Sequence, residues 1–294
     1  MRLARFRGPA GPRLGVVVGD EVVDLGGTGL PADTAALLAA GPDALDGVRQ
    51  AAARATDRLP LAGVELLAPV PRPPKLLAIG LNYASHVAEG LVERPAPEHQ
   101  LWFNKQATCV IGPGEAIHVP RASEQVDYEG ELAFVVGRRC RHVPAARAHE
   151  VVAGFTVLND VSVRDWQFRT PTLTMGKSFD THGPLGPWLV TADELGDPHD
   201  LCLRTWVNGD LRQDSSTGDL IFDCWAMVEH LTTAFTLEPG DVVATGTPAG
   251  VGAARRPPVW LRAGDVVRIE IEGIGRLENP VVDEPGDTAT GLDR

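Results

Sequence analysis

Short runs of apolar or alternating apolar and polar residues, separated by Gly, Pro and Asn, make up most of the chain and predict many β-strands. Examples are LLAIG at 76–80, VVATG at 242–246 and VVRIEIEG at 266–273. Apolar residues at helical spacing are less frequent, and they occur around residues 33–55, around residues 82–92 and in FDCWAMVEHLTTAF at 222–235. This balance predicts a rolled or barrel-like β structure with a few helices.

A proline-rich segment, LLAPVPRPPK at 66–75, divides the chain, because its four prolines favour an extended connection over a helix. Before it, residues 1–25 have the pattern of short strands joined by tight turns. We therefore expect a small N-terminal α/β domain of residues 1–70 and a larger domain of residues 71–283. Residues 284–294 are predicted to form a polar C-terminal tail.

The charge balance argues against nucleic acid or an anionic membrane surface as a partner. The chain has 27 basic and 39 acidic residues, a net charge of −12 and no basic cluster. It has no run of about 18 apolar residues and no apolar segment of a secretion signal. Its cysteines show no CxxC spacing and are expected to be reduced, so we predict a soluble cytoplasmic protein. They are Cys109, Cys140, Cys202 and Cys224.

The stretch VDYEGELAF at 126–134 places three acids on one face if it is extended. Side chains of a strand alternate between faces, so Asp127, Glu129 and Glu131 share a side on which the stretch has no cation. Like charges about 7 Å apart raise one another's pKa unless a positive group lies between them. A solvated face is the simplest alternative. We expect that outcome for Glu270 and Glu272, which have the same spacing and share their face with a basic residue.

A divalent cation would explain the acids, since Mg²⁺ binds one or two carboxylates together with water or substrate oxygens. Glu129 and Glu131 are placed to converge on one ion, with Asp127 as an ordinary flanking residue. Asp160, at the end of GFTVLND, is a candidate third ligand from a second strand. Its alternative role is that of an Asx turn or a helix cap.

Two further segments carry candidate chemistry. His86 and Glu89 in GLNYASHVAEG are three residues apart and would be neighbours on a helix. A histidine held by a carboxylate is a usable general base, although a plain surface pair is the alternative. Lys177 lies among turn-forming residues, where it faces an anion or only water. The loop after VVATG offers hydroxyls and close backbone N–H groups but contains no GK[ST], and the chain contains no GxSxG.

The succession GLNYASHVAEG, DYEGELAFVVGRR, GFTVLNDVSVRDWQ, GKSFDTHGPLGPW, VNGDLRQDSSTGDLIF and PGDVVATGTPAGVG closely resembles the fumarylacetoacetate hydrolase family, from about residue 72 to 282. The N-terminal segment resembles the leading domain of medium-length bacterial members. The resemblance implies an α+β, β-rich fold, a mixed β-sandwich roll with a small N-terminal domain. It also implies a homodimer with one Mg²⁺ or Mn²⁺ per subunit, with Ca²⁺ as a further candidate.

The resemblance also assigns residues. Glu129, Glu131 and Asp160 match the metal ligands, and His86 and Glu89 match a pair that activates water in hydrolytic members. Further matches are a catalytic lysine, Lys177, and substrate-binding residues, Arg164, Gln167 and Thr247. Trp102, Asn104, Arg169 and His182 are candidates for the distal part of the pocket, without a ranking.

The expected reaction is hydrolysis of a C–C bond in an acylpyruvate-type 2,4-dioxo acid through a metal-stabilised pyruvate enolate. The same enolate would serve a decarboxylase of oxaloacetate, or a tautomerase or isomerase of a hydroxydienedioate. A non-catalytic binding protein with a structural ion is the alternative from another class.

Overall fold

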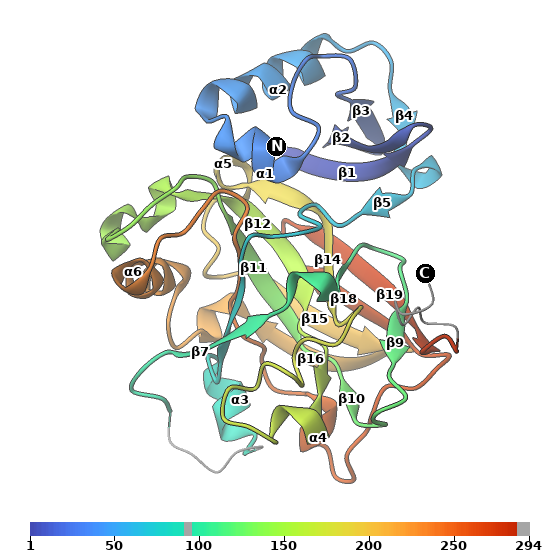
Figure 1. The fold of residues 1–294 in the computed structure, drawn as a ribbon, viewed down its shortest axis with the longest axis vertical. Coiled ribbons are helices and arrows are strands. Elements are labelled where there is room, and N and C mark those ends of the chain that lie inside the picture. The colour runs from blue at the N-terminus through green and yellow to red at the C-terminus, as the bar shows by residue number, and fades with distance from the viewer. Residues whose placement is uncertain (91–95, 287–294) are drawn as a thin grey trace, which may run out of the picture.

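The computed structural model describes residues 1–90 and 96–286, and its largest element is a mixed sheet of twelve strands. Strands β11, β12 and β14 run through the centre of the molecule, with the N-terminal strands at one end and α3 and α4 at the other (Figure 1). The sheet has the order β4-β3-β2-β1-β14-β12-β11-β17-β6-β7, with β5 beside β1 and β8 beside β14. Its strands are β1 (Arg2–Gly8), β2 (Gly11–Val18), β3 (Glu21–Asp24), β4 (Leu59–Pro60), β5 (Leu66–Leu67), β6 (Leu76–Gly80), β7 (Leu101–Lys105), β8 (Val110–Ile111), β11 (Gly130–Val136), β12 (Val152–Asn159), β14 (Gly183–Thr191) and β17 (Val242–Ala244).

A second sheet of five strands packs on one face of the central strands, where β18 and β19 contact β12 and β19 contacts β14. Its order is β16-β15-β18-β19-β9. These strands are β9 (Ile117–Val119), β15 (Cys202–Val207), β16 (Asp210–Ser216), β18 (Val266–Ile271) and β19 (Gly275–Asp283). A two-stranded pair joins β10 (Val126–Asp127) to β13 (Ser162–Val163).

The main sheet is buried on both faces, as the strand β11 shows. Leu132 and Phe134 enter the cluster shared with the second sheet, whereas Ala133 and Val135 enter a cluster shared with the N-terminal segment. Every residue of β11 is buried. A strand covered on both faces needs side chains that pack on both, which is why GELAFVV is nearly continuous in apolar residues after its glutamate.

The N-terminal segment joins the main sheet directly, because β1 pairs antiparallel with β14. Its helices α1 (Thr34–Ala39) and α2 (Pro42–Arg54) form where the sequence predicts helices. Leu3 and Leu37 share a cluster with Leu185 of β14. The two parts of the chain therefore share a sheet and a core cluster, and the division near residue 70 stays a prediction of the sequence.

The remaining helices are short, and none of the described helices is long and apolar enough to cross a membrane. They are α3 (Ala84–Ala88), α4 (Arg164–Gln167), α5 (Ala192–Leu195) and α6 (Cys224–Ala234). The helix expected over residues 82–92 is thus shorter in the described part, and residues 91–95 lie outside it. Strands β16 and β19 were not predicted, because charged residues interrupt their alternation. Most of the predicted tail, residues 287–294, lies outside the described residues.

Candidate active site

Three carboxylates meet where β11 and β12 lie side by side. Glu131 lies in β11, Glu129 directly precedes this strand, and Asp160 directly follows β12. The pairing of Gly130 with Asn159 brings these positions together, and the Asp160 N–H donates to the Glu129 carbonyl oxygen at 2.9 Å. One carboxylate oxygen from each side chain lies within 4.8 Å of the other two, and all three residues are buried. The structure thus brings together the three residues that the sequence nominates as metal ligands.

The glycine between the two glutamates has a packing reason. A side chain on Gly130 would clash with the Thr205 hydroxyl of β15, which belongs to the second sheet. The Gly130 N–H donates to Gln213 Oε1 at 3.0 Å. Gly130 therefore lets the start of β11 approach the second sheet closely, while the carboxylates of Glu129 and Glu131 join the triad.

Basic side chains also surround the triad, and the sequence nominates one of them, Lys177. Lys177 Nζ lies 2.7 Å from both Glu129 Oε2 and Asp160 Oδ2. Arg164 Nη1 lies 2.7 Å from Glu129 Oε1. Lys105 Nζ lies 2.7 Å from Asp160 Oδ1 with both side chains fully buried. Part of the expected positive charge thus comes from the chain itself.

Sequence reasoning missed Lys105, although its strand carried a sign of it. In β7, Phe103 and Lys105 are both buried and the residue between them is exposed. A lysine on the apolar face of a strand is rarely buried without an anionic partner. That pattern would have predicted a buried acid opposite Lys105, which is Asp160.

The two glutamates differ in their electrostatics. Burial alone would raise the pKa of Glu129, but the charges of Lys177 and Arg164 outweigh it and hold this pKa well below its ordinary value. Burial, followed by the charges of Asp160 and Glu129, raises the pKa of Glu131 well above its ordinary value. Among the described residues, Glu131 has no ion-pair partner, and its Oε2 accepts the Gly246 N–H at 2.8 Å.

The site therefore fits a hard divalent cation. The donor set consists only of carboxylate oxygens, which Mg²⁺ and Mn²⁺ prefer. Burial and the neighbouring acids disfavour the charged form of Glu131, and a cation beside it would favour that form. Ligand roles for Glu129, Glu131 and Asp160 remain our proposal.

The interpretation of Asp127 as an ordinary flanking residue was wrong. Its carboxylate is fully buried, and Oδ2 lies 2.9 Å from Arg164 Nε and 2.7 Å from Nη2. Its oxygens also accept backbone N–H groups from Gly252 at 2.8 Å and Ala253 at 3.0 Å. Asp127 ends β10 and two residues outside either strand separate it from β11, so one continuous strand does not carry all three acids. The prediction for the equally spaced Glu270 and Glu272 holds, because Glu272 is exposed and Glu270 is partly exposed.

His86 and Glu89 form the predicted pair on α3 and its C-terminal cap. His86 Nδ1 lies 3.0 Å from Glu89 Oε2, and Glu89 Oε1 accepts the Gly250 N–H at 2.7 Å. His86 lines the same pocket as Glu129 and Glu131. Because Glu89 holds Nδ1, the Nε2 atom of His86 is the one available to the pocket.

The loop after β17 connects Glu89 to the segment that carries Glu129 and Glu131, because Gly250 of this loop bonds to both Glu89 and Tyr128. The Tyr128 hydroxyl donates to the Gly250 carbonyl oxygen at 2.8 Å. At the start of α3, the Ser85 N–H donates to Asp219 Oδ2 at 2.9 Å, and Asn82 Nδ2 donates to the Thr245 carbonyl oxygen at 2.8 Å. Residues far apart in the sequence thus fix the position of His86.

The three predicted substrate-binding residues also line the pocket. Arg164 Nη1 donates to Gln167 Oε1 at 2.9 Å, next to the contact with Glu129. The Thr247 hydroxyl donates to the Gly130 carbonyl oxygen at 3.0 Å and accepts from Gln213 Nε2 at 2.8 Å. Sequence reasoning gave no role to Gln213, which lies on β16, a strand it failed to predict.

The pocket has a volume of about 310 Å³, and none of the four distal candidates lines it. Trp102 bonds to Gln100, and Asn104 is exposed on the far side of β7. The Arg169 guanidinium stacks over the Trp166 ring at 3.9 Å. His182 is fully buried, and burial lowers its pKa to about 3. These expectations were wrong, because edge-strand orientation and local stacking direct the side chains elsewhere.

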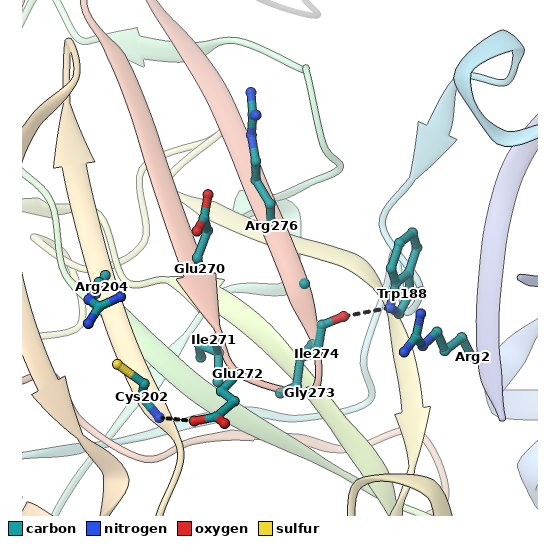
Figure 2. Close-up of a pocket in the computed structure, with 11 residues that line it drawn as sticks. Arg2, Trp188, Cys202, Arg204, Glu270, Ile271, Glu272, Gly273, Ile274 and Arg276 are labelled. Atoms are coloured by element: carbon teal, nitrogen blue, oxygen red, sulfur yellow. Dashed lines mark hydrogen bonds between the residues drawn. The ribbon is translucent and has the colours of Figure 1, made fainter. Parts of the chain in front are cut away.

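A second hollow of about 660 Å³ surrounds the turn between β18 and β19 (Figure 2). Its arginines are paired with surface acids, for example Arg204 with Asp214 at 2.9 Å and Arg276 with Glu278 at 2.6 Å. Figure 2 shows the Glu272 carboxylate accepting the Cys202 N–H. This open groove lacks a group of buried acids, and the smaller pocket is the candidate active site.

Comparisons with known proteins agree with this geometry. Residues 75–282 match the family described as "Fumarylacetoacetate (FAA) hydrolase C-terminal", and residues 1–69 match "Rv2993c-like, N-terminal". The chain is 42% identical over 290 residues to the mitochondrial oxaloacetate tautomerase fahd2 of Xenopus laevis, covering 96% of this chain and 90% of the relative.

Solved structures with the same fold include enzymes of two kinds. The maleylpyruvate hydrolase of Sphingobium sp. SYK-6, in complex with manganese(II) and pyruvate, is 37% identical with a TM-score of 0.82, covering 97% of this chain and 100% of that one. The 5-carboxymethyl-2-hydroxymuconate delta-isomerase of Mycobacterium smegmatis is 39% identical with a TM-score of 0.77 and the same coverage. The predicted family and β-rich fold are confirmed, and the chain belongs to the fumarylacetoacetate hydrolase family.

Proposed function

We propose that this protein is a metal-dependent hydrolase that cleaves a C–C bond in an acylpyruvate-type 2,4-dioxo acid. The observation that carries the proposal is that a candidate base and candidate metal ligands share one pocket. His86, which Glu89 holds, lines the same pocket as Glu129 and Glu131, and Asp160 groups with these two glutamates.

Glu129, Glu131 and Asp160 would hold Mg²⁺ or Mn²⁺, and manganese in the related maleylpyruvate hydrolase supports this choice. When bound, such an ion supplies Lewis acidity to the 2-oxo group and favours its enolate form. Burial lowers the pKa of Lys177, but Asp160 and Glu129 outweigh it and raise this pKa above its ordinary value. Lys177 therefore acts as a fixed positive charge rather than as a base.

His86 is placed to act as the general base. Its Nε2 takes a proton from water, whose oxygen attacks the carbonyl carbon at position 4 of the substrate. The C3–C4 bond then breaks, and its electron pair passes to C3. The products are a carboxylic acid and the enolate of pyruvate, which takes up a proton at C3. Glu89 holds the imidazole ring and balances its charge.

The second candidate is keto–enol tautomerisation of oxaloacetate. The 42% identity to oxaloacetate tautomerase over 96% of the chain favours it. Tautomerisation needs a proton to move between C3 and the enol oxygen, so His86 would act as a proton carrier without activating water. The decarboxylase and isomerase alternatives use the same enolate.

The test is to incubate the protein and Mn²⁺ with acylpyruvates, oxaloacetate and hydroxydienedioates, to identify cleavage products by mass, and to follow ketonisation and isomerisation, which leave the mass unchanged, by ultraviolet absorbance. We expect pyruvate and an acid from acylpyruvates, and a fall of about 10²-fold or more in kcat for His86→Ala. Chelation, or Glu131→Gln, should abolish turnover. An unchanged acylpyruvate together with rapid ketonisation of oxaloacetate would replace the hydrolase by the tautomerase.

The expected homodimer and the cytoplasmic location remain predictions. Sedimentation equilibrium of the purified protein would measure the mass of the assembly. A mass equal to the 31.3 kDa chain would contradict the homodimer.

A further inference from the structure

The pocket has an apolar wall in addition to its polar residues. The wall comes from three segments: the end of β6 and the residue that follows it, strand β7, and the segment after α4. Its seven apolar side chains are Ile79, Leu81, Leu101, Phe103, Phe168, Pro171 and Leu173.

This wall extends from the acidic triad to the opening of the pocket. Phe103 lies at the inner end, where it is 6% exposed and its ring centroid is 4.9 Å from Lys177 Nζ. Phe168 lies at the outer end and is 53% exposed. A substrate whose 2-oxo acid group reaches the triad would therefore place its far end along apolar side chains.

The described lining residues offer no free cation for a second carboxylate at this far end. Arg164 and Lys177 are the only arginine and lysine among them, and both are paired with Glu129. Arg169, which follows Phe168, stacks on Trp166 and bonds to Asp165 at 3.4 Å. The Thr170 hydroxyl also lines the pocket and lies 3.1 Å from the Thr172 hydroxyl. A carboxylate placed against this wall would therefore lose water without gaining a cationic partner among the described lining residues, which is unfavourable.

We propose that the outer half of the pocket binds an apolar acyl group, alkyl or aryl, and that Phe168 and Leu173 determine the size it accepts. As a statement about substrate specificity, this proposal rests on the proposed hydrolysis. It separates this chain from relatives named for maleylpyruvate and oxaloacetate, which both carry a second carboxylate.

The test measures binding separately from turnover. Calorimetry in Mn²⁺ compares 2-oxo acids of equal carbon number that end in a methyl or a carboxylate group: 2-oxopentanoate with 2-oxoglutarate, and 2-oxohexanoate with 2-oxoadipate. We expect the methyl-ended acid to bind at least about tenfold more tightly in each pair. Affinity should rise up to about fourfold for each added methylene, from the transfer free energy of a CH₂ group.

Variants locate the effect. Phe168→Ala should reduce the gain per methylene, and Phe168→Arg should favour the carboxylate-ended acids. The control Phe235→Ala changes an exposed phenylalanine outside this pocket and should leave both series unchanged. Tighter binding of the carboxylate-ended acids by the unmodified protein would overturn the proposal, as would an equal effect of Phe168→Ala on both series.

The two proposals fail in different ways. If alkyl acylpyruvates are not cleaved but the methyl-ended acids bind more tightly, the hydrolase proposal fails and the apolar site stands. If carboxylated acylpyruvates are cleaved and their 2-oxo acid counterparts bind more tightly, the hydrolase stands and the apolar site fails.

Discussion

Replacing Asp127 by Asn removes a buried charge while keeping the shape of the side chain. Oδ2 accepts the Arg164 Nε–H at 2.9 Å and the Ala253 N–H at 3.0 Å, and it forms an ion pair with Arg164 Nη2 at 2.7 Å. Oδ1 accepts the N–H groups of Tyr128 at 2.9 Å and Gly252 at 2.8 Å. Among the described residues, every polar group that contacts this carboxylate is therefore a hydrogen-bond donor or a cation.

The size of the effect follows from these contacts. An asparagine has one oxygen, so either the arginine side or the backbone side of the carboxylate would face an amide that cannot accept. A buried donor left without an acceptor costs about 1–3 kcal/mol, and breaking a buried ion pair costs about 3–5 kcal/mol. Arg164 keeps its contact with Glu129 at 2.7 Å, so we expect the free energy of unfolding to fall by about 3 kcal/mol, the lower end of the range for a broken ion pair.

Urea denaturation monitored by tryptophan fluorescence, in EDTA, measures this loss. In a separate thermal denaturation, the midpoint temperature should fall by about 6–12 °C, because each kcal/mol of lost stability lowers it by about 2–4 °C. The control Glu270→Gln changes a side chain that is 44% exposed, and its stability should stay within about 0.5 kcal/mol of the parent. If Asp127→Asn matched that control, our account of Asp127 as the anchor of Arg164 would be refuted.

Three further predictions concern the metal site and the thiols. In thermal denaturation, Mn²⁺ at a hundredfold excess over Kd should stabilise the protein by about 2.7 kcal/mol. Glu131→Gln should abolish this stabilisation, whereas the control Glu270→Gln should leave it unchanged. Lys105→Met should destabilise the protein more in EDTA than in Mn²⁺, because the added cation replaces a charge beside the acids; equal losses would argue against this. Burial raises the pKa of the Cys109 and Cys224 thiols, so a thiol reagent should label both only after denaturation, as peptide mass mapping can check.

Much of the site was predictable because its residues lie in short, ordered motifs. Glu129 precedes Glu131 of β11 by two residues, and His86 and Glu89 lie on one helical turn, so each pair is close because of local spacing. Asp160 required only that two consecutive strands pair, which β11 and β12 do. The family resemblance then supplied the roles that these residues are proposed to have.

Lys105 and Asp127 were not predictable in the same way. Lys105 is 55 residues from its partner Asp160, and Arg164 is 37 residues from Asp127. A burial pattern hints at such a partner but cannot name it. Phe168 and Leu173 lie in a loop whose path over the pocket follows from packing, since no periodic pattern specifies it.

The sequence by itself determined the β-rich fold through hydrophobic periodicity, which acts over short distances along the chain. It indicated the family, the carboxylates and the histidine pair through short motifs whose order resembles that family. Only the tertiary structure decided which cations balance the buried acids and which side chains form the distal wall. Ion pairing and desolvation depend on distances across sheets and loops. Those distances are set by the packing of segments that the sequence does not place relative to one another.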